Sequence, residues 1–338
     1  MRNQQISVLV AGGADYAQEA EPPYDDEAIW AKLVESGAEE SWSHSLHSSV
    51  VWSVFERDGV VYSASGNDTV KAVDASDRTE IWSHELHSDS VFSVFERDGV
   101  VYSGANDDTV VAADASDGSE IWSHSLHSGR VRQVFERDGV VYSGEGGFGD
   151  DAVIAADASD GSEIWSHELH SDRVYSVFER DGVVYSGSMD ETVKAVDASD
   201  QSEIWSHSLH SDEVRSVFER DGVVYSGSHD ETVIAADASD GSEIWSHSLH
   251  SDNVYSVFAR DGVVYSGARD ETVVAADASN GTEIWSHSLH SDNVQSVFER
   301  DGVVYSGSSD ETVKAANILT DVNLRFGFDN KWLPMEEQ

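Results

Sequence analysis

Histidine is the residue that most suggests chemistry in this sequence, because fourteen of its fifteen histidines occur in His-x-x-His pairs such as His207 and His210. Imidazole is a common metal ligand, so this spacing raises the question of a metal site. In a β-strand, however, residues three apart point to opposite faces. Seven similar pairs spread along the chain also build no single site, and we therefore expect no metal ligands.

Other catalytic arrangements are absent from the sequence. The chain has no cysteine, which excludes disulfides, thiolate zinc sites and cysteine nucleophiles. No nucleophile–base pair and no phosphate-binding glycine loop stands out. Asp190-Glu191 and its copies could hold cations, but a solvated acidic pair is the simpler interpretation. We expect a non-enzymatic protein with no catalytic residues and no cofactor.

Charge narrows the range of partners. The 338 residues include 65 acidic and 20 basic side chains, for a formal net charge of -45 at pH 7. Direct binding to nucleic acid is disfavoured, because that affinity comes from Lys and Arg. An excess of acid with 15 Arg and only 5 Lys is typical of proteins that work in molar salt, where the Debye length is about 3 Å. We interpret the chain as halophilic, from the cytoplasm of a halophile or from a virus particle; the alternative is an acidic mesophilic protein with a cationic partner.

No apolar run approaches the roughly 20 residues needed to span a bilayer, so no membrane span is expected. Residues 6–11 after Arg2 only faintly resemble a signal peptide. The sequence leaves the localisation open.

A repeat of about forty residues must position all of these side chains. The segment Trp-Ser-His-x-Leu-His-Ser begins at Trp42, Trp82, Trp122, Trp165, Trp205, Trp245 and Trp285, and the one longer step of 43 residues has its insertion within 144–150. Each unit predicts four short strands, as at 163–169, 174–179, 183–187 and 192–197. Asp181-Gly182 between two of them predicts a type I′ hairpin. Arg78 and Gln201 replace the glycine of the second turn, so that turn must tolerate other residues.

Four antiparallel strands repeated seven times predict an all-β fold, a seven-bladed β-propeller. The strand at Trp42 is left over at the start, and the last unit lacks its outer strand after residues 312–316. Pairing the two would close the ring; the alternative is that residues 323–328 supply the final strand. We divide the chain into an N-terminal extension (1–40), the propeller (41–316) and a C-terminal tail (317–338).

Two repeat families resemble these motifs. Leu-His-Ser-Asp-x-Val-x-Ser-Val-Phe and Ser-Gly-Ser-x-Asp-x-Thr-Val-Lys resemble WD repeats, although Val or Ala stands where that family has the Trp of Trp-Asp. The resemblance implies that His210 and its equivalents hold turns. The segment from Ala235 to Trp245 resembles the tryptophan-docking pattern of PQQ-like, or quinoprotein-like, repeats. The acidic composition resembles proteins of haloarchaea or of their viruses. Because propellers host many functions, the resemblance leaves function open.

The two ends suggest docking segments. Residues 25–36 predict a helix with an apolar stripe, and the C-terminal tail carries several aromatic residues. Both could simply cap the propeller, or they could dock a larger assembly. The residues that would do so are Ile29, Trp30, Leu33, Phe326, Phe328 and Trp332.

Variable columns in the repeat predict a binding face. One column reads Val50, Ser90, Arg130, Arg173, Glu213, Asn253 and Asn293. Two residues on come Trp52, Phe92, Arg132, Tyr175, Arg215, Tyr255 and Gln295. A third reads Gly66, Asn106, Met189, His229, Arg269 and Ser309, interrupted in the third unit by the Phe148 insertion. These positions open on one rim of a propeller, and the resemblance to WD repeats implies that this rim binds ligands.

The content of the columns favours recognition, since Trp, Tyr and Arg are enriched at binding hot spots. The predicted ligand contacts are Val50, Trp52, Phe92, Arg130, Arg132, Phe148, Arg173, Tyr175, Met189, Glu213, Arg215, His229, Asn253, Tyr255, Arg269, Asn293 and Gln295. Neutral drift after duplication is the alternative, but other exposed positions stay nearly fixed. We expect a binding propeller for a protein or surface glycan. The alternatives are a structural or adhesive subunit of a virus tail or spike and a quinoprotein-like enzyme.

Overall fold

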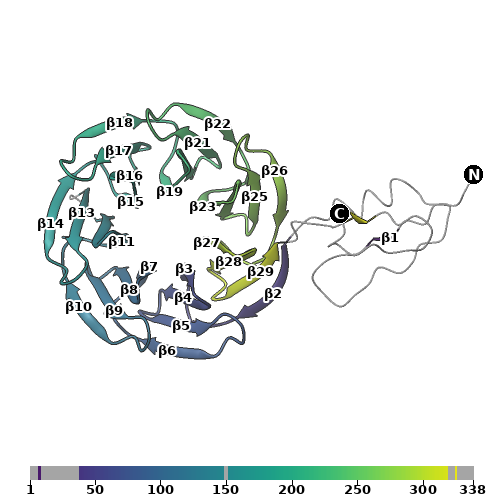
Figure 1. The fold of residues 1–338 in the computed structure, drawn as a ribbon, viewed down its shortest axis with the longest axis horizontal. Helices are drawn as coiled ribbons and strands as arrows, with labels where there is room; N and C mark the ends of the chain where they lie inside the picture. Colours follow the sequence, from purple (N-terminus) through teal and green to yellow (C-terminus); the bar gives the residue numbers. More distant parts are fainter. Residues whose placement is uncertain (1–6, 9–37, 148–150, 319–323, 326–338) are drawn as a thin grey trace, which may run out of the picture.

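Seven four-stranded antiparallel sheets surround a central axis as the blades of a propeller (Figure 1). The computed structural model describes residues 7–8, 38–147, 151–318 and 324–325. No helix occurs within these ranges. The all-β, seven-bladed fold predicted from the repeat is confirmed.

Each blade runs outward from the axis in chain order. The first three blades consist of β3 (Val51–Arg57), β4 (Val60–Ser65), β5 (Val70–Asp74) and β6 (Glu80–His84); β7 (Val91–Arg97), β8 (Val100–Ala105), β9 (Val110–Asp114) and β10 (Glu120–His124); and β11 (Val131–Arg137), β12 (Val140–Glu145), β13 (Ala152–Asp157) and β14 (Glu163–Glu168). The next three consist of β15 (Val174–Arg180), β16 (Val183–Ser188), β17 (Val193–Asp197) and β18 (Glu203–His207); β19 (Val214–Arg220), β20 (Val223–Ser228), β21 (Val233–Asp237) and β22 (Glu243–His247); and β23 (Val254–Arg260), β24 (Val263–Ala268), β25 (Val273–Asp277) and β26 (Glu283–His287).

The seventh blade joins both ends of the repeat. Its strands are β27 (Val294–Arg300), β28 (Val303–Ser308), β29 (Val313–Ile318) and, outermost, β2 (Ala38–His44). Trp42 pairs with Ala315, so the strand at the start of the propeller closes the ring as predicted. The alternative closure is wrong, because β30 (Leu324–Arg325) pairs with β1 (Ser7–Val8) in a separate two-stranded sheet. The strand from the start of the propeller thus gives the seventh blade the same four strands as the other six.

Several predictions about the ends fall outside the described residues. The helix predicted over 25–36 lies there, as do the proposed docking residues Ile29, Trp30, Leu33, Phe326, Phe328 and Trp332.

The hairpin between the first two strands of each blade has the predicted geometry. Asp181 has φ 53° and Gly182 has φ 84°, and both values are positive as a type I′ turn requires. In the outer turn Gly241 has φ 71°, and Gln201 adopts φ 60° at the equivalent position. The substitution noted in the sequence therefore keeps the turn while placing a side chain in a region that favours glycine.

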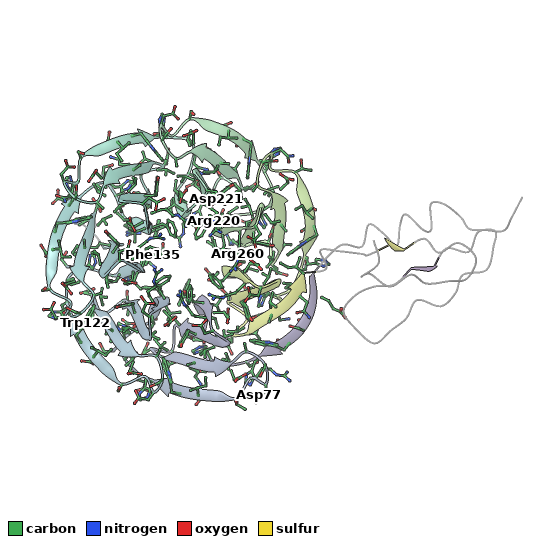
Figure 2. All side chains as sticks on the ribbon, in the orientation of Figure 1. Asp77, Trp122, Phe135, Arg220, Asp221 and Arg260 are labelled. Atoms are coloured by element: carbon green, nitrogen blue, oxygen red, sulfur yellow. The ribbon has the colours of Figure 1, made fainter. Side chains whose placement is uncertain are left out.

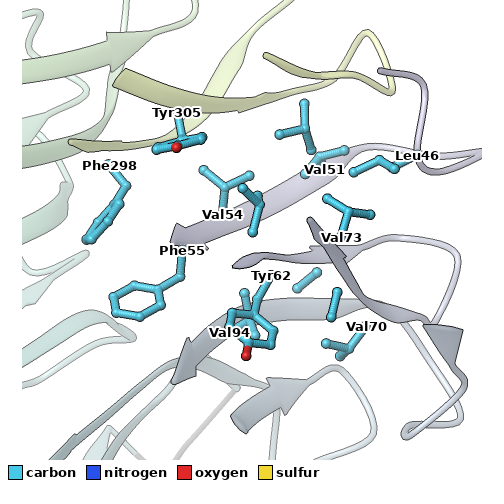
Figure 3. Close-up of a cluster of buried hydrophobic side chains, with 14 of the residues drawn as sticks. Leu46, Val51, Val54, Phe55, Tyr62, Val70, Val73, Val94, Phe298 and Tyr305 are labelled. Atoms are coloured by element: carbon cyan, nitrogen blue, oxygen red, sulfur yellow. The ribbon is translucent and has the colours of Figure 1, made fainter. Parts of the chain in front are cut away.

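The core lies between neighbouring blades. Figure 3 shows one such cluster, in which Val51, Phe55 and Tyr62 of the first blade meet Val94 of the second and Phe298 of the seventh. All five side chains are buried.

Glycine in the second strand of a blade lets the next blade approach closely. A Cβ on Gly187 would lie 2.7 Å from Cγ1 of Val214, which is too close for a side chain. The β-branched valine of the next blade fills that space instead, which fixes the distance between the two sheets.

Tryptophan docking ties the outer strands of neighbouring blades together. The indole N–H of Trp205 donates to the carbonyl of Ala238 at 2.9 Å, and its ring covers Gly241, where a Cβ would lie 2.8 Å away. Trp165 keeps the equivalent bond to Ala198 at 3.0 Å although Gln201 replaces the glycine, but Trp165 is only half-buried. This is the contact that the PQQ-like pattern predicted.

Candidate functional site

The inner strand of every blade carries a β-bulge at the same place. In β3 the pairing with β4 skips Trp52, because Val51 faces Ser65 while Ser53 faces Ala64. The same shift occurs in the other six inner strands. A bulge redirects a side chain relative to regular alternation.

The seven bulge residues meet at one mouth of the central channel. They line a hollow of about 450 Å³, counting the part open to solvent, which we call the cup. Its residues are Trp52, Phe92, Arg132, Tyr175, Arg215, Tyr255 and Gln295. The structure therefore brings together the second variable column of the sequence, all seven members of which were predicted as ligand contacts.

Aromatic rings and guanidinium groups alternate around much of the cup. The guanidinium carbon of Arg132 lies 4.3 Å from the ring centre of Phe92 and 5.7 Å from that of Tyr175. The guanidinium carbon of Arg215 lies 3.9 Å from Tyr175 and 5.6 Å from Tyr255. Both charges are held by cation–π contacts. The arc continues where Trp52 meets Phe92 edge to face, with centroids 5.5 Å apart.

Arg132 is the most confined charge in the cup. Burial lowers its pKa to about 10, and the nearby positive charge of Arg215 acts in the same direction. Its stem lies against Gly146, where a Cβ would clash with the arginine Cγ. Its Nε has no hydrogen-bond partner, and Arg132 forms no ion pair within the described ranges. The guanidinium is thus positioned by rings and backbone rather than by a carboxylate.

The first and third variable columns form the rim above the cup. The backbone N–H of Met189 donates to the carbonyl of Arg173, and the same bond joins the two columns in each of the seven blades. In the third blade Gly146 holds the position that the sequence pattern gave to the Phe148 insertion, and Phe148 itself lies outside the described residues.

The remaining predicted contacts occupy this rim in pairs. In the first blade the carbonyl of Val50 accepts the N–H of Gly66, and in the third the carbonyl of Arg130 accepts the N–H of Gly146. In the sixth blade Asn253 accepts from Arg269, and in the seventh Asn293 accepts from Ser309. Gln295 donates to Ser309 Oγ at 3.0 Å, which links a cup residue to the rim. The geometry places these residues on one face, and their role in binding stays a prediction.

One group on the rim has the composition of a metal site. Asp212, Glu213 and His229 each offer a ligand atom, and these atoms lie within 4.8 Å of one another. The carboxylate of Glu213 is already engaged, since Arg215 Nη1 and His229 Nδ1 both lie 3.4 Å from its Oε2. The guanidinium of Arg215 would compete with a metal cation for the Glu213 carboxylate. We therefore interpret the group as one that positions Arg215 rather than as a metal site.

A closed ring of phenylalanines forms the floor below the cup. Each Phe lies three residues after a cup residue, and the bulge turns both toward the axis. Neighbouring centroids are 4.5 to 4.8 Å apart all the way round, including the pair across the seam between the first and seventh blades. Figure 2 shows Phe135 pointing to the axis, whereas Trp122 lies at the outer edge. The members are Phe55, Phe95, Phe135, Phe178, Phe218, Phe258 and Phe298.

A belt of side-chain hydrogen bonds holds the inner strands together around the cup. Val217 N–H donates to Ser176 Oγ of the preceding blade at 2.9 Å, and seven such bonds complete the circle. Gln133 replaces serine in the third blade and accepts from Val177 at 3.0 Å. The belt fixes the positions of the bulge residues next to it.

The other mouth of the channel is lined by ion pairs between blades. Glu219 Oε1 accepts the N–H of Gly222 in its own hairpin at 2.7 Å, and Arg180 Nε of the preceding blade lies 3.3 Å from Oε2. Burial raises the pKa of Glu219, while Gly222 and Arg180 oppose that rise. Equivalent pairs are Arg57–Glu96, Arg97–Glu136, Arg137–Glu179, Arg260–Glu299 and Arg300–Glu56.

The His-x-x-His pairs do not converge, as predicted. His210 is buried and bonds Ser226 Oγ through Nε2 at 2.8 Å and Asp230 through Nδ1, which fixes the following turn. His207 instead lies against Trp205 on the outer strand and bonds the carbonyl of Asp240.

The third blade keeps its histidine network by a substitution that the sequence did not reveal. His127 Nδ1 lies 3.4 Å from Glu145 Oε2, which takes the place of the turn aspartate displaced by the insertion. Ser128 also donates to Glu145, at 3.0 Å. The only available signal was the buried-strand position of Glu145, where the other repeats have Ser or Ala.

Comparison with known proteins fits this geometry. The PQQ-like repeat family model described as outer membrane protein assembly factor BamB matches residues 23–180, 116–257 and 229–323. The chain belongs to this family. The tryptophan-docking contacts described above, such as that of Trp205 with the carbonyl of Ala238, match the repeat pattern that the sequence shares with this family. No curated protein matches the chain.

Solved structures share the fold. The WD40 beta propeller domain of Doa1 has a TM-score of 0.74 and 22% identity, covering 83% of this chain and 97% of that one. The computationally designed Ika8 protein has a TM-score of 0.67 and 24% identity, covering 83% and 100%. At this identity the likeness concerns the fold alone. Neither structure nor the family identifies a halophilic or viral source.

A quinone cofactor with calcium is the group that the family resemblance raises. Calcium takes oxygen ligands, chiefly carboxylates. The seven cup residues include no carboxylate, and two of them are arginines. The residues of the cup therefore do not fit a quinone with its calcium ion.

In the described part of the chain, no helix is long and apolar enough to cross a membrane.

Proposed function

We propose that this chain is a non-enzymatic recognition propeller of a halophilic system, whose cup receives an acidic segment of a partner protein. The observation that carries the proposal is Arg132, a confined guanidinium without an ion-pair partner in the described residues of a chain with 65 acids. A guanidinium stacked on a ring still presents N–H groups in its plane to a carboxylate.

The arrangement of the rings favours a carboxylate over a neutral sugar. A sugar would stack on an exposed aromatic face. Tyr175 has guanidinium groups near it from both Arg132 and Arg215, and Arg132 also covers Phe92. The groups left to recognise a ligand are the guanidinium N–H donors. This supports an acidic peptide, with an acidic glycan as the competing outcome.

Rigidity supports the same role. The seven-bond belt and the phenylalanine ring hold the bulge residues in place before any ligand arrives. A preorganised site loses little conformational entropy on binding. The lack of carboxylates in the cup supports a non-enzymatic role, and the overall charge supports an environment of molar salt, where surface repulsion is screened.

The test measures binding of a fluorescent Asp/Glu-rich peptide and of an oligogalacturonate in molar salt. The double variant Arg132→Gln/Arg215→Gln is expected to weaken peptide binding at least tenfold. Arg78→Gln is the control, because it removes one positive charge from an exposed outer turn, away from the cup. Equal binding by wild type and the double variant would overturn the proposal, and tight binding of the sugar acid alone would replace the peptide with a glycan.

A structural subunit of a particle, the second function that the sequence raised, rests on end segments outside the described residues. No observation in the described residues favours it over recognition.

A further inference from the structure

The ion-pair mouth of the channel contains six copies of one carboxylate-binding arrangement. In each copy a Glu near the end of the inner strand accepts the N–H of the hairpin glycine through Oε1. Its Oε2 faces the Arg Nε of the preceding blade at 3.3 to 3.8 Å. We call these two donors the carboxylate cradle.

The sixth blade has the cradle without the carboxylate, because Ala259 stands where the other blades have Glu. Gly262, with φ 79°, forms the same hairpin as its six equivalents but has no carboxylate oxygen to receive its N–H. Within the described residues, Arg220 of the fifth blade forms no ion pair across the blade boundary.

Arg220 differs from its equivalents in the way this substitution predicts. Its side chain is 37% exposed, against 23 to 29% for the six arginines that face a Glu. Its Nε lies 3.3 Å from Asp221 of its own hairpin, whereas the same pair spans 3.5 to 4.0 Å in the five equivalents that form it. Figure 2 shows Arg220 and Asp221 beside the central channel.

We propose that this sixth cradle binds a small free carboxylate anion of the acetate class. Glu differs from Ala by CH₂–COO⁻, so acetate supplies the atoms that Ala259 lacks. The carboxylate would accept the N–H of Gly262 with one oxygen and a guanidinium N–H of Arg220 with the other. Charge-assisted bonds of this kind are the strong ones in proteins. The site lies at the mouth opposite the cup and does not depend on the proposed function of the cup.

Acidic neighbours set the conditions under which the anion binds. Asp221 and Asp261 flank the cradle and are exposed, and Arg260 is committed to Glu299 of the next blade. At about 1 M salt the Debye length is roughly 3 Å, so exposed carboxylates beyond direct contact repel a bound anion little. The measurement therefore belongs in molar salt.

Thermal unfolding of the full chain in sodium acetate, exchanged for sodium chloride at constant sodium, tests the proposal. Acetate is expected to raise the Tm of wild type by about 2–4 °C in a saturable way. Ala259→Glu fills the cradle covalently and is expected to raise Tm in chloride and to abolish the acetate increment. Arg220→Gln, which removes the guanidinium of a half-buried side chain, is expected to abolish the increment without filling the site.

A matched variant makes the same site elsewhere. Glu219→Ala leaves Arg180 and Gly222 without their carboxylate, so its Tm is expected to fall in chloride and to gain a larger acetate increment than wild type. Acetate also stabilises proteins generally by exclusion from their surface. Equal increments in wild type, Ala259→Glu and Arg220→Gln would show only that general effect and would overturn the proposal.

Discussion

A single amide in the first blade should make the stability of the propeller sensitive to mild acid. Five other blades place an Asp beside the buried histidine of the turn, as Asp107 does beside His87. The first blade has Asn67, whose Oδ1 lies 3.2 Å from Nδ1 of His47. Burial lowers the pKa of His47 to about 4, against an ordinary value of 6.5.

The sign of the effect follows from which state binds the proton. Unfolded chains protonate this histidine near pH 6.5, whereas the folded chain resists until about pH 4. Stability is therefore lost as pH falls through this interval. At 1.36 kcal/mol per pKa unit, the loss between pH 7 and pH 5 is about 2 kcal/mol.

Asn67→Asp should remove most of that loss. The new carboxylate would face Nδ1 of His47 and favour the protonated imidazole. We expect the variant to match wild type near pH 7 and to exceed its Tm at pH 5 by about 4–8 °C. Thermal unfolding followed by circular dichroism in molar salt measures this. Every other titrating group is common to both proteins and cancels in the difference.

Asp107→Asn in the second blade is the reverse control. Burial raises the pKa of Asp107, but hydrogen bonds from His87, Thr109 and Ser88 outweigh it and hold the pKa well below its usual range. Removing this carboxylate should add an acid-dependent loss like that of the first blade. Parallel Tm curves for wild type and Asn67→Asp between pH 7 and pH 5 would refute the reasoning.

Three further outcomes follow from the fold. Gln201→Gly removes a side chain from a residue with positive φ and should stabilise the chain by about 1 kcal/mol in chemical unfolding. Gly241→Gln should destabilise it by more, because a Cβ at that position meets the docked indole of Trp205. Ser176→Ala leaves the N–H of Val217 without its acceptor and should cost about 1–3 kcal/mol in the same assay; a loss below a few tenths would contradict the belt. Because burial raises the pKa of Glu219, its contribution to stability grows as pH falls through that pKa, so the Tm of wild type relative to Glu219→Gln should rise as pH falls.

The repeat allowed the fold to be predicted from the sequence. Seven copies of one unit define the blade, its two turns and the number of blades, and the leftover strand at Trp42 predicts the closure. The strand at 163–169 ends one residue earlier in the structure, at Glu168, which is the ordinary uncertainty of a boundary. The helix predicted over 25–36 has no repeat to support it and lies outside the described residues.

The site was only partly readable. Variation along the repeat identified the cup residues, but their convergence depends on a bulge that leaves no mark in composition. The phenylalanines of the floor and the serines of the belt hardly vary from one repeat to the next, so variation between repeats could not identify them. Both depend on contacts between residues about forty positions apart, which a pattern within one unit does not contain.

Positions where one blade departs from the repeat show which contacts another residue restores and which are left incomplete. Where the insertion displaces the turn aspartate of the third blade, Glu145 restores the carboxylate beside His127, so that break is repaired. Ala259 is not repaired in this way, because no carboxylate of the described residues receives the N–H of Gly262 and Arg220 reaches only Asp221 of its own hairpin. Arg132 is likewise held in place without a carboxylate from the described residues. A fold selected only for stability would supply a carboxylate to Arg220 and Gly262, as it does to their equivalents at the six other blade boundaries. Arg132 and Arg220 lie at opposite mouths of one axis with the ring of phenylalanines between them. Arg220 reaches Asp221 of its own hairpin but no Glu of the next blade, and we propose an external anion for each arginine.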